Sequence, residues 1–180
     1  MTETRDVGSL VERGLRHFRD GMYPEALEAY SEARKAFLAG GDLLNAAEML
    51  NNIGVIHRIE RRKAAAVAAL QEAHDSFKEL GDLSRAAQAL GNMGSVYAGV
   101  RERETAIHHY GRAAEIFAEL GDGNRQGEVL MALGSVQMKQ RRWHQAVAAY
   151  HAGLCALETR SLFQRLLLWL LSIARERISL

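Results

Sequence analysis

Residues 90–97 read LGNMGSVY, and three similar stretches stand at constant distances from them. LNNIGVIH occupies residues 50–57, LMALGSVQ occupies 130–137, and LVERGLRH occupies 10–17. Each stretch begins with leucine and has glycine in fifth place, so the glycines recur every 40 residues. A fixed period of this length is typical of repeat proteins. The sequence therefore predicts four copies of one structural unit.

Each repeat also carries a small residue twelve positions after its glycine. These residues are Ala26, Ala66, Ala106 and Ala146, and four positions further on stand Tyr30, Leu70, Tyr110 and Tyr150. Side chains four residues apart lie on one face of an α-helix, so each repeat is predicted to hold two helices. The glycine and the alanine mark where the two backbones approach, because larger side chains would hold the helices apart.

Turn signals separate the predicted helices. The sequence reads Gly41-Asp42, Gly81-Asp82 and Gly121-Asp122 between successive repeats. Glycine accepts the left-handed conformation that ends many helices, and aspartate caps the free N–H groups of the next helix. In the second repeat, these signals place the first helix at about 43–60 and the second at about 63–79.

This pattern resembles the tetratricopeptide repeat, whose signature is W-x2-L-G-x2-Y, then A-x3-F, then P. The fullest copy runs from Leu90 through Gly94 to Tyr97, and then from Ala106 to Tyr110. The longer period and the Gly-Asp turns are similar to the extended repeats of kinesin light chains, Leu-Gly-Asn polarity adaptors and bacterial regulators. The resemblance covers about residues 8–158. It implies a polypeptide ligand held in a concave groove that the first helix of each repeat lines.

We expect one all-α domain over residues 1–180, a tetratricopeptide-type superhelix of helix-turn-helix repeats. The expected repeats cover about residues 7–42, 43–82, 83–122 and 123–159, and a fifth, unpaired helix covers 161–178. That last helix is apolar around most of its circumference, so something must cover it. The residues predicted to mediate self-association are Leu166, Leu167, Trp169 and Leu170. A homodimer through residues 161–180, a downstream domain or a partner protein would each cover them.

The resemblance implies that ligand contacts lie on the side of each first helix that faces away from its own repeat. The predicted peptide-binding residues are Glu48, Asn51, Asn52, Val55, Arg58, Gln88, Asn92, Ser95, Met131, Ser135, Met138, Leu168 and Leu171. Asparagine suits such a groove because its amide offers both a donor and an acceptor to a peptide backbone. The alternative is that the asparagines are solvated surface positions. The change from polar to apolar residues along the list favours an amphipathic helix as ligand.

Charged residues gather at the two kinds of turn. Basic residues stand between the helices of a repeat, at Arg58, Arg61, Arg62, Lys63, Arg101, Arg103, Lys139, Arg141 and Arg142. Acidic residues stand between repeats, at Asp42, Glu79, Asp82, Glu119 and Asp122. Interaction with the helix dipoles accounts for both sets, and binding of an acidic partner is the alternative.

The composition argues against several other classes of protein. A net charge of +1 gives no bulk attraction to nucleic acid, so we expect no such partner. The single cysteine, Cys155, and the polar N-terminus favour the cytoplasm, and no apolar run is long enough to cross a membrane. Without metal-ligand spacings, phosphate loops or catalytic motifs, the sequence predicts no metal, no cofactor and no enzyme activity. The excess of arginine over lysine points to a GC-rich bacterial source.

The sequence therefore predicts a non-enzymatic protein–protein interaction module that binds a peptide or an amphipathic helix. Two alternatives stay open. One is a structural module that associates with itself through the last helix. The other is a peptide-sensing regulatory domain of a bacterial signalling system.

Overall fold

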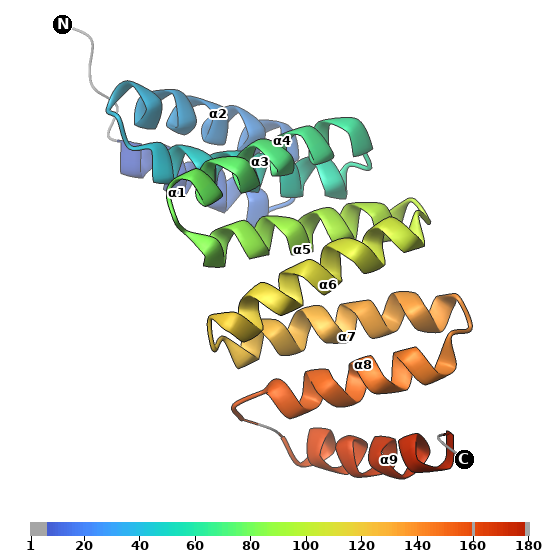
Figure 1. The fold of residues 1–180 in the computed structure, drawn as a ribbon. Coiled ribbons are helices and arrows are strands. Elements are labelled where there is room, and N and C mark those ends of the chain that lie inside the picture. The colour runs from blue at the N-terminus through green and yellow to red at the C-terminus, as the bar shows by residue number, and fades with distance from the viewer. Residues whose placement is uncertain (1–6, 160, 179–180) are drawn as a thin grey trace, which may run out of the picture. The chain divides into compact units, whose positions relative to one another are not determined.

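The computed structural model describes residues 7–159 and 161–178, and over these residues the chain forms nine α-helices and no strand (Figure 1). The helices are α1 (Val7–Arg19), α2 (Tyr23–Ala39), α3 (Leu43–Ile59), α4 (Lys63–Glu79), α5 (Leu83–Gly99), α6 (Arg103–Glu119), α7 (Gly123–Lys139), α8 (Trp143–Ala156) and α9 (Leu162–Ile178). The predicted all-α fold, with four helix pairs and a fifth first helix, is confirmed. Residues 1–6, the polar N-terminus from which a cytoplasmic location is expected, lie outside the described residues.

The helices keep the 40-residue register of the sequence. The first helices of repeats two to four begin at Leu43, Leu83 and Gly123, and the second helices begin at Tyr23, Lys63, Arg103 and Trp143. The predicted bounds in the second repeat are confirmed to within one residue. Because the same turn returns every 40 residues, the backbone repeats as faithfully as the sequence.

The turns between repeats follow the predicted chemistry. Gly41 has φ of +76°, and the N–H groups of Gly41 and Asp42 donate to the carbonyls of Leu38 and Phe37. This bond pattern is the Schellman ending of a helix. The carboxylate of Asp42 then accepts from the backbone N–H of Asn45 at 3.1 Å, and thereby caps α3. The caps predicted at Asp82 and Asp122 are confirmed in the same way.

The chain divides into two compact units, residues 1–96 (unit 1) and 97–180 (unit 2), with the boundary inside α5. In unit 1, α1 to α4 pack in sequence. Leu10, Tyr30 and Ile56 belong to a core cluster of α1 to α3, and Leu50 and Phe77 belong to a second cluster that includes α4. A Cβ atom built on Gly54 would lie 2.7 Å from Cγ of Leu70, too near for any real contact. The prediction that these glycines mark close helix approaches is therefore confirmed.

In unit 2, α6, α7, α8 and α9 pack in sequence (Figure 1). Tyr110 and Val136 form its core with Ala106. The backbones of α7 and α8 come especially close, because a Cβ on Gly127 would lie 2.7 Å from the carbonyl oxygen of Gly153. At this crossing, backbone lies against backbone, because a side chain on either glycine would meet the carbonyl of the other.

The fifth first helix, α9, begins with a capping box. The backbone N–H of Gln164 donates to Oγ of Ser161 at 3.2 Å, and the N–H of Ser161 donates to Oε1 of Gln164 at 2.8 Å. The two bonds satisfy free N–H groups at the helix start. The described helix begins at Leu162, one residue after the predicted start, and it packs on α8.

Candidate functional site

Two of the asparagines predicted to bind peptide, Asn51 and Asn92, form a hydrogen bond between two helices of unit 1. Asn51 on α3 is 3% exposed, and its Oδ1 accepts a hydrogen bond of 3.0 Å from Nδ2 of Asn92 on α5. A buried amide needs such a partner, because losing it leaves a polar group without water or protein contact. This pair therefore has a structural role between neighbouring repeats.

Glu48 is also engaged within unit 1. Its carboxylate accepts from Nε of Arg85 at 2.7 Å, and Nη1 of Arg85 donates to Asp82 at 2.6 Å. The hydrogen bond to Asp82 and the charge of Glu48 raise the pKa of Arg85. Gln88, on α5 with Arg85, is exposed, whereas Arg58 on α3 and Ser95 on α5 are half-buried. This part of the surface is thus a network of paired charges.

Asn52 and Val55 line a small cavity in unit 1. The cavity has a volume of about 120 Å³, and its other walls are Leu15 and Phe18 of α1 and Tyr30 of α2. Burial raises the pKa of Tyr30, with Arg19 acting in the opposite direction. The phenol therefore stays neutral at physiological pH. The cavity is an apolar hollow with one amide in its wall.

In unit 2, two of the predicted peptide-binding residues contact their own repeat. Oγ of Ser135 lies 2.7 Å from the hydroxyl of Tyr150 on α8. Met131 lies against α8, since its Cγ would be 3.1 Å from a Cβ on Gly153. Met138, at 41% exposed, has a large open surface. The predicted list is therefore divided between two units, with Glu48 to Ser95 in unit 1 and Met131 to Leu171 in unit 2.

The apolar face of α9 divides into covered and open positions. Leu167, Leu168 and Leu171 are half-buried. Leu166 is 54%, Trp169 59% and Leu170 49% exposed. The side chains of residues 174–178, and residues 179–180, belong to the predicted self-association segment but lie outside the described part of the chain.

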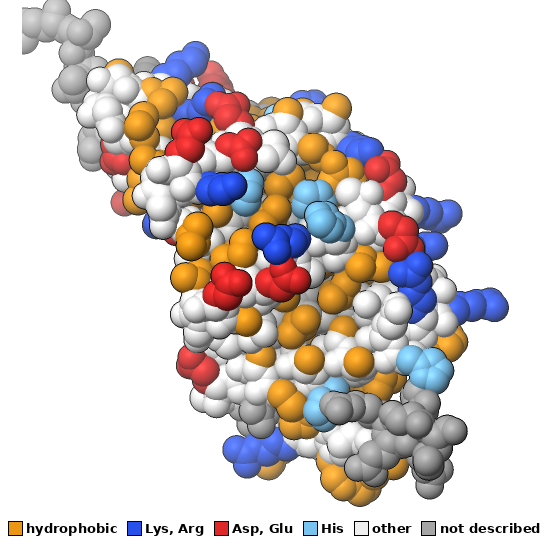
Figure 2. Space-filling view, viewed as in Figure 1, with side chains coloured by type: hydrophobic (Ala, Val, Ile, Leu, Met, Phe, Trp, Pro, Cys, Tyr) orange, Lys and Arg blue, Asp and Glu red, His pale blue; other side chains and the backbone are white. Residues whose placement is uncertain are grey.

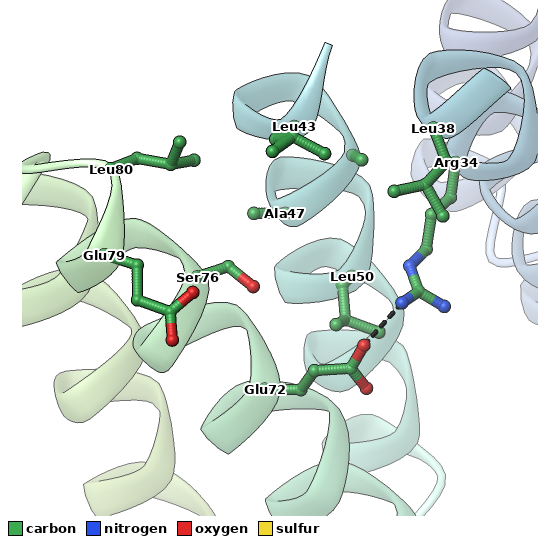
Figure 3. Close-up of a pocket in the computed structure, with 10 residues that line it drawn as sticks. Arg34, Leu38, Leu43, Ala47, Leu50, Glu72, Ser76, Glu79 and Leu80 are labelled. Carbon is green, nitrogen blue, oxygen red and sulfur yellow. Dashed lines mark hydrogen bonds and ion pairs between the residues drawn. The ribbon is translucent and has the colours of Figure 1, made fainter. Parts of the chain in front are cut away.

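A second, larger cavity in unit 1 was not foreseen from the sequence. It has a volume of about 240 Å³ and is lined by α2, α3 and α4, with Leu43, Ala47 and Leu50 on the central helix, α3 (Figure 3). Nη2 of Arg34 and Oε1 of Glu72 meet across it at 2.5 Å. Both residues come from second helices, where the sequence shows only separate charged positions. Their pairing across two repeats carries no local signal.

Among the described residues, no group of three or more His, Cys, Asp or Glu side chains is placed to hold a metal ion. Within that same part of the chain, no helix is long and apolar enough to span a membrane. The rings of Tyr97 and His109 stack at 5.2 Å, which assigns one of the histidines to packing.

Two family models match the chain. Residues 8–79 match the model described as Tetratricopeptide repeat, and residues 58–164 match the model described as Soluble NSF attachment protein, SNAP. The second match covers more than half of the chain. A search of curated protein sequences finds no relative.

Several solved structures share the fold. BtubC (BKLC) from P. vanneervenii is 21% identical with a TM-score of 0.75, and the match covers 88% of this chain and 72% of that chain. The apo form of RapI is 15% identical with a TM-score of 0.76, over 93% of this chain and 48% of that chain. A Rap protein complexed with Competence and Sporulation Factor is 16% identical with a TM-score of 0.73, over 88% of this chain and 44% of that chain. The chain thus spans less than half of either Rap protein.

Proposed function

Because the chain belongs to the tetratricopeptide repeat family, and over residues 58–164 to the related helical family described as soluble NSF attachment protein, SNAP, we propose that it binds a peptide segment of another protein. It acts as a non-enzymatic interaction module. The solved Rap protein complexed with Competence and Sporulation Factor supports a polypeptide as the class of ligand. A peptide-sensing role in bacterial signalling is one biological form of this activity.

The observation that carries the proposal is the cavity lined by Leu15, Phe18, Tyr30, Asn52 and Val55. An apolar cavity of about 150 Å³ in another protein holds one benzene molecule, so a cavity of about 120 Å³ suits a single aliphatic side chain. The amide of Asn52 lies in the wall and can donate to, and accept from, a peptide backbone beside that side chain. The ligand is therefore a peptide, extended or helical, with one aliphatic anchor.

The test is a selection of random peptides displayed on phage, with the intact chain immobilised through a tag. The best peptide is then synthesised with a fluorescent label, and its Kd is measured by polarisation. Val55→Trp fills the cavity and should raise Kd tenfold or more, about 1.4 kcal/mol. Ser76→Trp places the same side chain at the second cavity and should leave Kd unchanged.

If Val55→Trp lowers the melting temperature, Asn52→Ala is used in its place as a milder variant. It removes the amide and leaves the apolar walls, and we expect it to raise Kd by about threefold to tenfold. Selected peptides that bind both variants as tightly as the parent chain would contradict the proposal. Failure to select any peptide would contradict it as well.

A second candidate function is self-association through α9, and the exposure of its apolar face favours it. Leu50 and Met49, at the equivalent positions of the second repeat, are 6% and 3% exposed, whereas Leu170 and Trp169 are 49% and 59% exposed. No second helix follows α9 among the described residues to cover them. A second copy of the chain presents the same leucine-rich face, and a two-fold pair would bury both.

Light scattering over a range of concentrations tests this second candidate. The intact chain should have the mass of a dimer, and Trp169→Glu should have that of a monomer. Trp143→Glu is the matched control, because Trp143 is 52% exposed on α8 and lies outside the apolar face of α9. A monomeric parent chain at every concentration would refute the dimer and leave the peptide proposal intact.

A further inference from the structure

Three of the turns inside repeats place arginine where the backbone favours glycine. Arg61, Arg101 and Arg141 have φ of +61°, +65° and +61°, the left-handed region that costs any residue with a Cβ free energy. The first repeat has Gly21 at the equivalent position, with φ of +75°. The turn itself therefore does not require arginine, and the same chain contains the less strained alternative.

The hydrogen bonds of these turns also show that the turn does not require an arginine side chain. The N–H of Arg141 donates to the carbonyl of Met138 at 2.9 Å, and the N–H of Arg142 donates to that of Gln137 at 3.0 Å. This is the Schellman pattern, in which the left-handed position is ordinarily glycine. Only backbone atoms of the arginine take part in it. The side chain of Arg141 is exposed, and none of the ion pairs found among the described residues involves it or Arg101.

In unit 2, a direct bridge brings two such turns together. Nη2 of Arg142 donates to Oε1 of Glu104 at 2.6 Å, Nη1 donates to Oε2 at 3.1 Å, and Nε2 of Gln140 donates to Oε1 at 2.9 Å. Glu104 follows the turn between α5 and α6, and Arg142 ends the turn between α7 and α8. The two turns therefore form one surface, which we call the basic edge and define as residues 100–104 and 139–143.

The basic edge has a net charge of +3, from five cations and two carboxylates. Figure 2 shows Lys and Arg side chains along this side of unit 2, where α5 meets α6 and α7 meets α8. Apolar surface lies among them, since Val100 is 39% and Trp143 52% exposed. The cations can bind carboxylates of a partner, and the exposed indole beside them can contact an apolar side chain of the same partner.

We propose that the basic edge of unit 2 binds an acidic segment of a partner protein. The carboxylates of such a segment pair with the guanidinium groups of Arg101 and Arg141, and an apolar side chain of the segment contacts Trp143. This surface is separate from the cavity in unit 1 and does not depend on what that cavity binds. The strain of the left-handed arginines is retained because glycine would remove the charges from the edge.

A peptide that alternates glutamate with serine, labelled with fluorescein, is the probe, and its glutamine counterpart is the control. Polarisation at low salt should show binding of the glutamate peptide only, weakening as salt is raised. Arg101→Gly together with Arg141→Gly should raise Kd about fivefold or more, and should raise the melting temperature of the intact chain. Weaker peptide binding together with a higher melting temperature is expected only if the two arginines strain the backbone and also bind the peptide.

Arg112→Gln is the matched control, because it removes an exposed cation on α6 that pairs with Glu115 and lies outside the basic edge. It should leave Kd unchanged. The proposal is overturned if the double variant binds the peptide as the parent does. It is also overturned if the variant loses stability, because the arginines would then serve the helix dipoles. Tighter arginine-dependent binding of a single-stranded oligonucleotide, or of vesicles containing phosphatidylserine, would overturn it in favour of that partner.

Discussion

Gly127 on α7 offers a stringent test of how closely the last two paired helices pack. A Cβ atom there would lie 2.7 Å from the carbonyl oxygen of Gly153 and 2.8 Å from Cδ2 of Leu157. Gly111 on α6, in the same unit, has nothing within 4 Å of its Cβ position. The same substitution, glycine to alanine, is therefore expected to have opposite effects at these two positions.

The magnitudes follow from two opposing contributions. Alanine is favoured over glycine inside a helix by about 1 kcal/mol, so Gly111→Ala should raise the free energy of unfolding by about that amount. Overpacking in a dense interior costs about 1–3 kcal/mol, and the upper part of that range applies where the obstacle is a backbone carbonyl that cannot rotate away. Gly127→Ala should therefore lower the free energy of unfolding by about 1–2 kcal/mol.

Urea unfolding followed by far-UV circular dichroism measures both effects. Gly153→Ala serves as a second probe, since its Cβ would lie 2.9 Å from the carbonyl oxygen of Gly127, and it should destabilise the chain in the same way. An increase in the urea midpoint of Gly127→Ala that equals the increase for Gly111→Ala would refute the close approach of α7 and α8.

Three further predictions concern single hydrogen bonds. Asn45 donates hydrogen bonds to Asp42 and holds the pKa of that carboxyl below its usual range. The ionised carboxylate therefore stabilises the native state at neutral pH, and this stabilisation is lost as pH falls through the lowered pKa. Asp42→Asn should accordingly flatten the acid limb of a stability–pH curve below about pH 4. Asn92→Ala leaves the buried oxygen of Asn51 without its donor and should cost about 1–3 kcal/mol in urea unfolding, while Asn52→Ala should change stability by less than about 0.5 kcal/mol. Ser135→Ala removes the contact with the Tyr150 hydroxyl and should cost about 0.5–1.5 kcal/mol, and an unchanged urea midpoint would exclude that bond.

The sequence period was enough to predict the helix pairs, and the helix bounds in the second repeat, because each repeat carries its own glycine, alanine and turn signals. Gly127 and Gly153 depart from the repeat pattern. They replace Ala47 and Ala87 on one side, and Ala33, Ala73 and Ala113 on the other. The loss of a methyl group at both facing positions indicates a closer approach in the last repeat.

The candidate site was less predictable, for a physical reason. Asn51 and Asn52 are neighbours of the same type, yet one is buried against Asn92 and the other lines a cavity. The packing of the following repeat decides which of the two asparagines is buried. The pattern of residues within one repeat does not describe this packing. The left-handed conformation of Arg61 was similarly hidden, although Gly21 at the same place in the first repeat was an available signal.

The strict spacing of the helices also has a consequence for how such a gene can change. The second helix of each repeat begins 40 residues after the second helix of the preceding repeat. Unequal crossing-over between two repeats therefore adds or removes a whole number of helix pairs and leaves each turn intact. Contacts such as that between Asn51 and Asn92 then decide which fusions succeed, because each junction must join two repeats whose side chains match. Array length can therefore vary by recombination, while specific side-chain pairs restrict the order in which repeats follow one another.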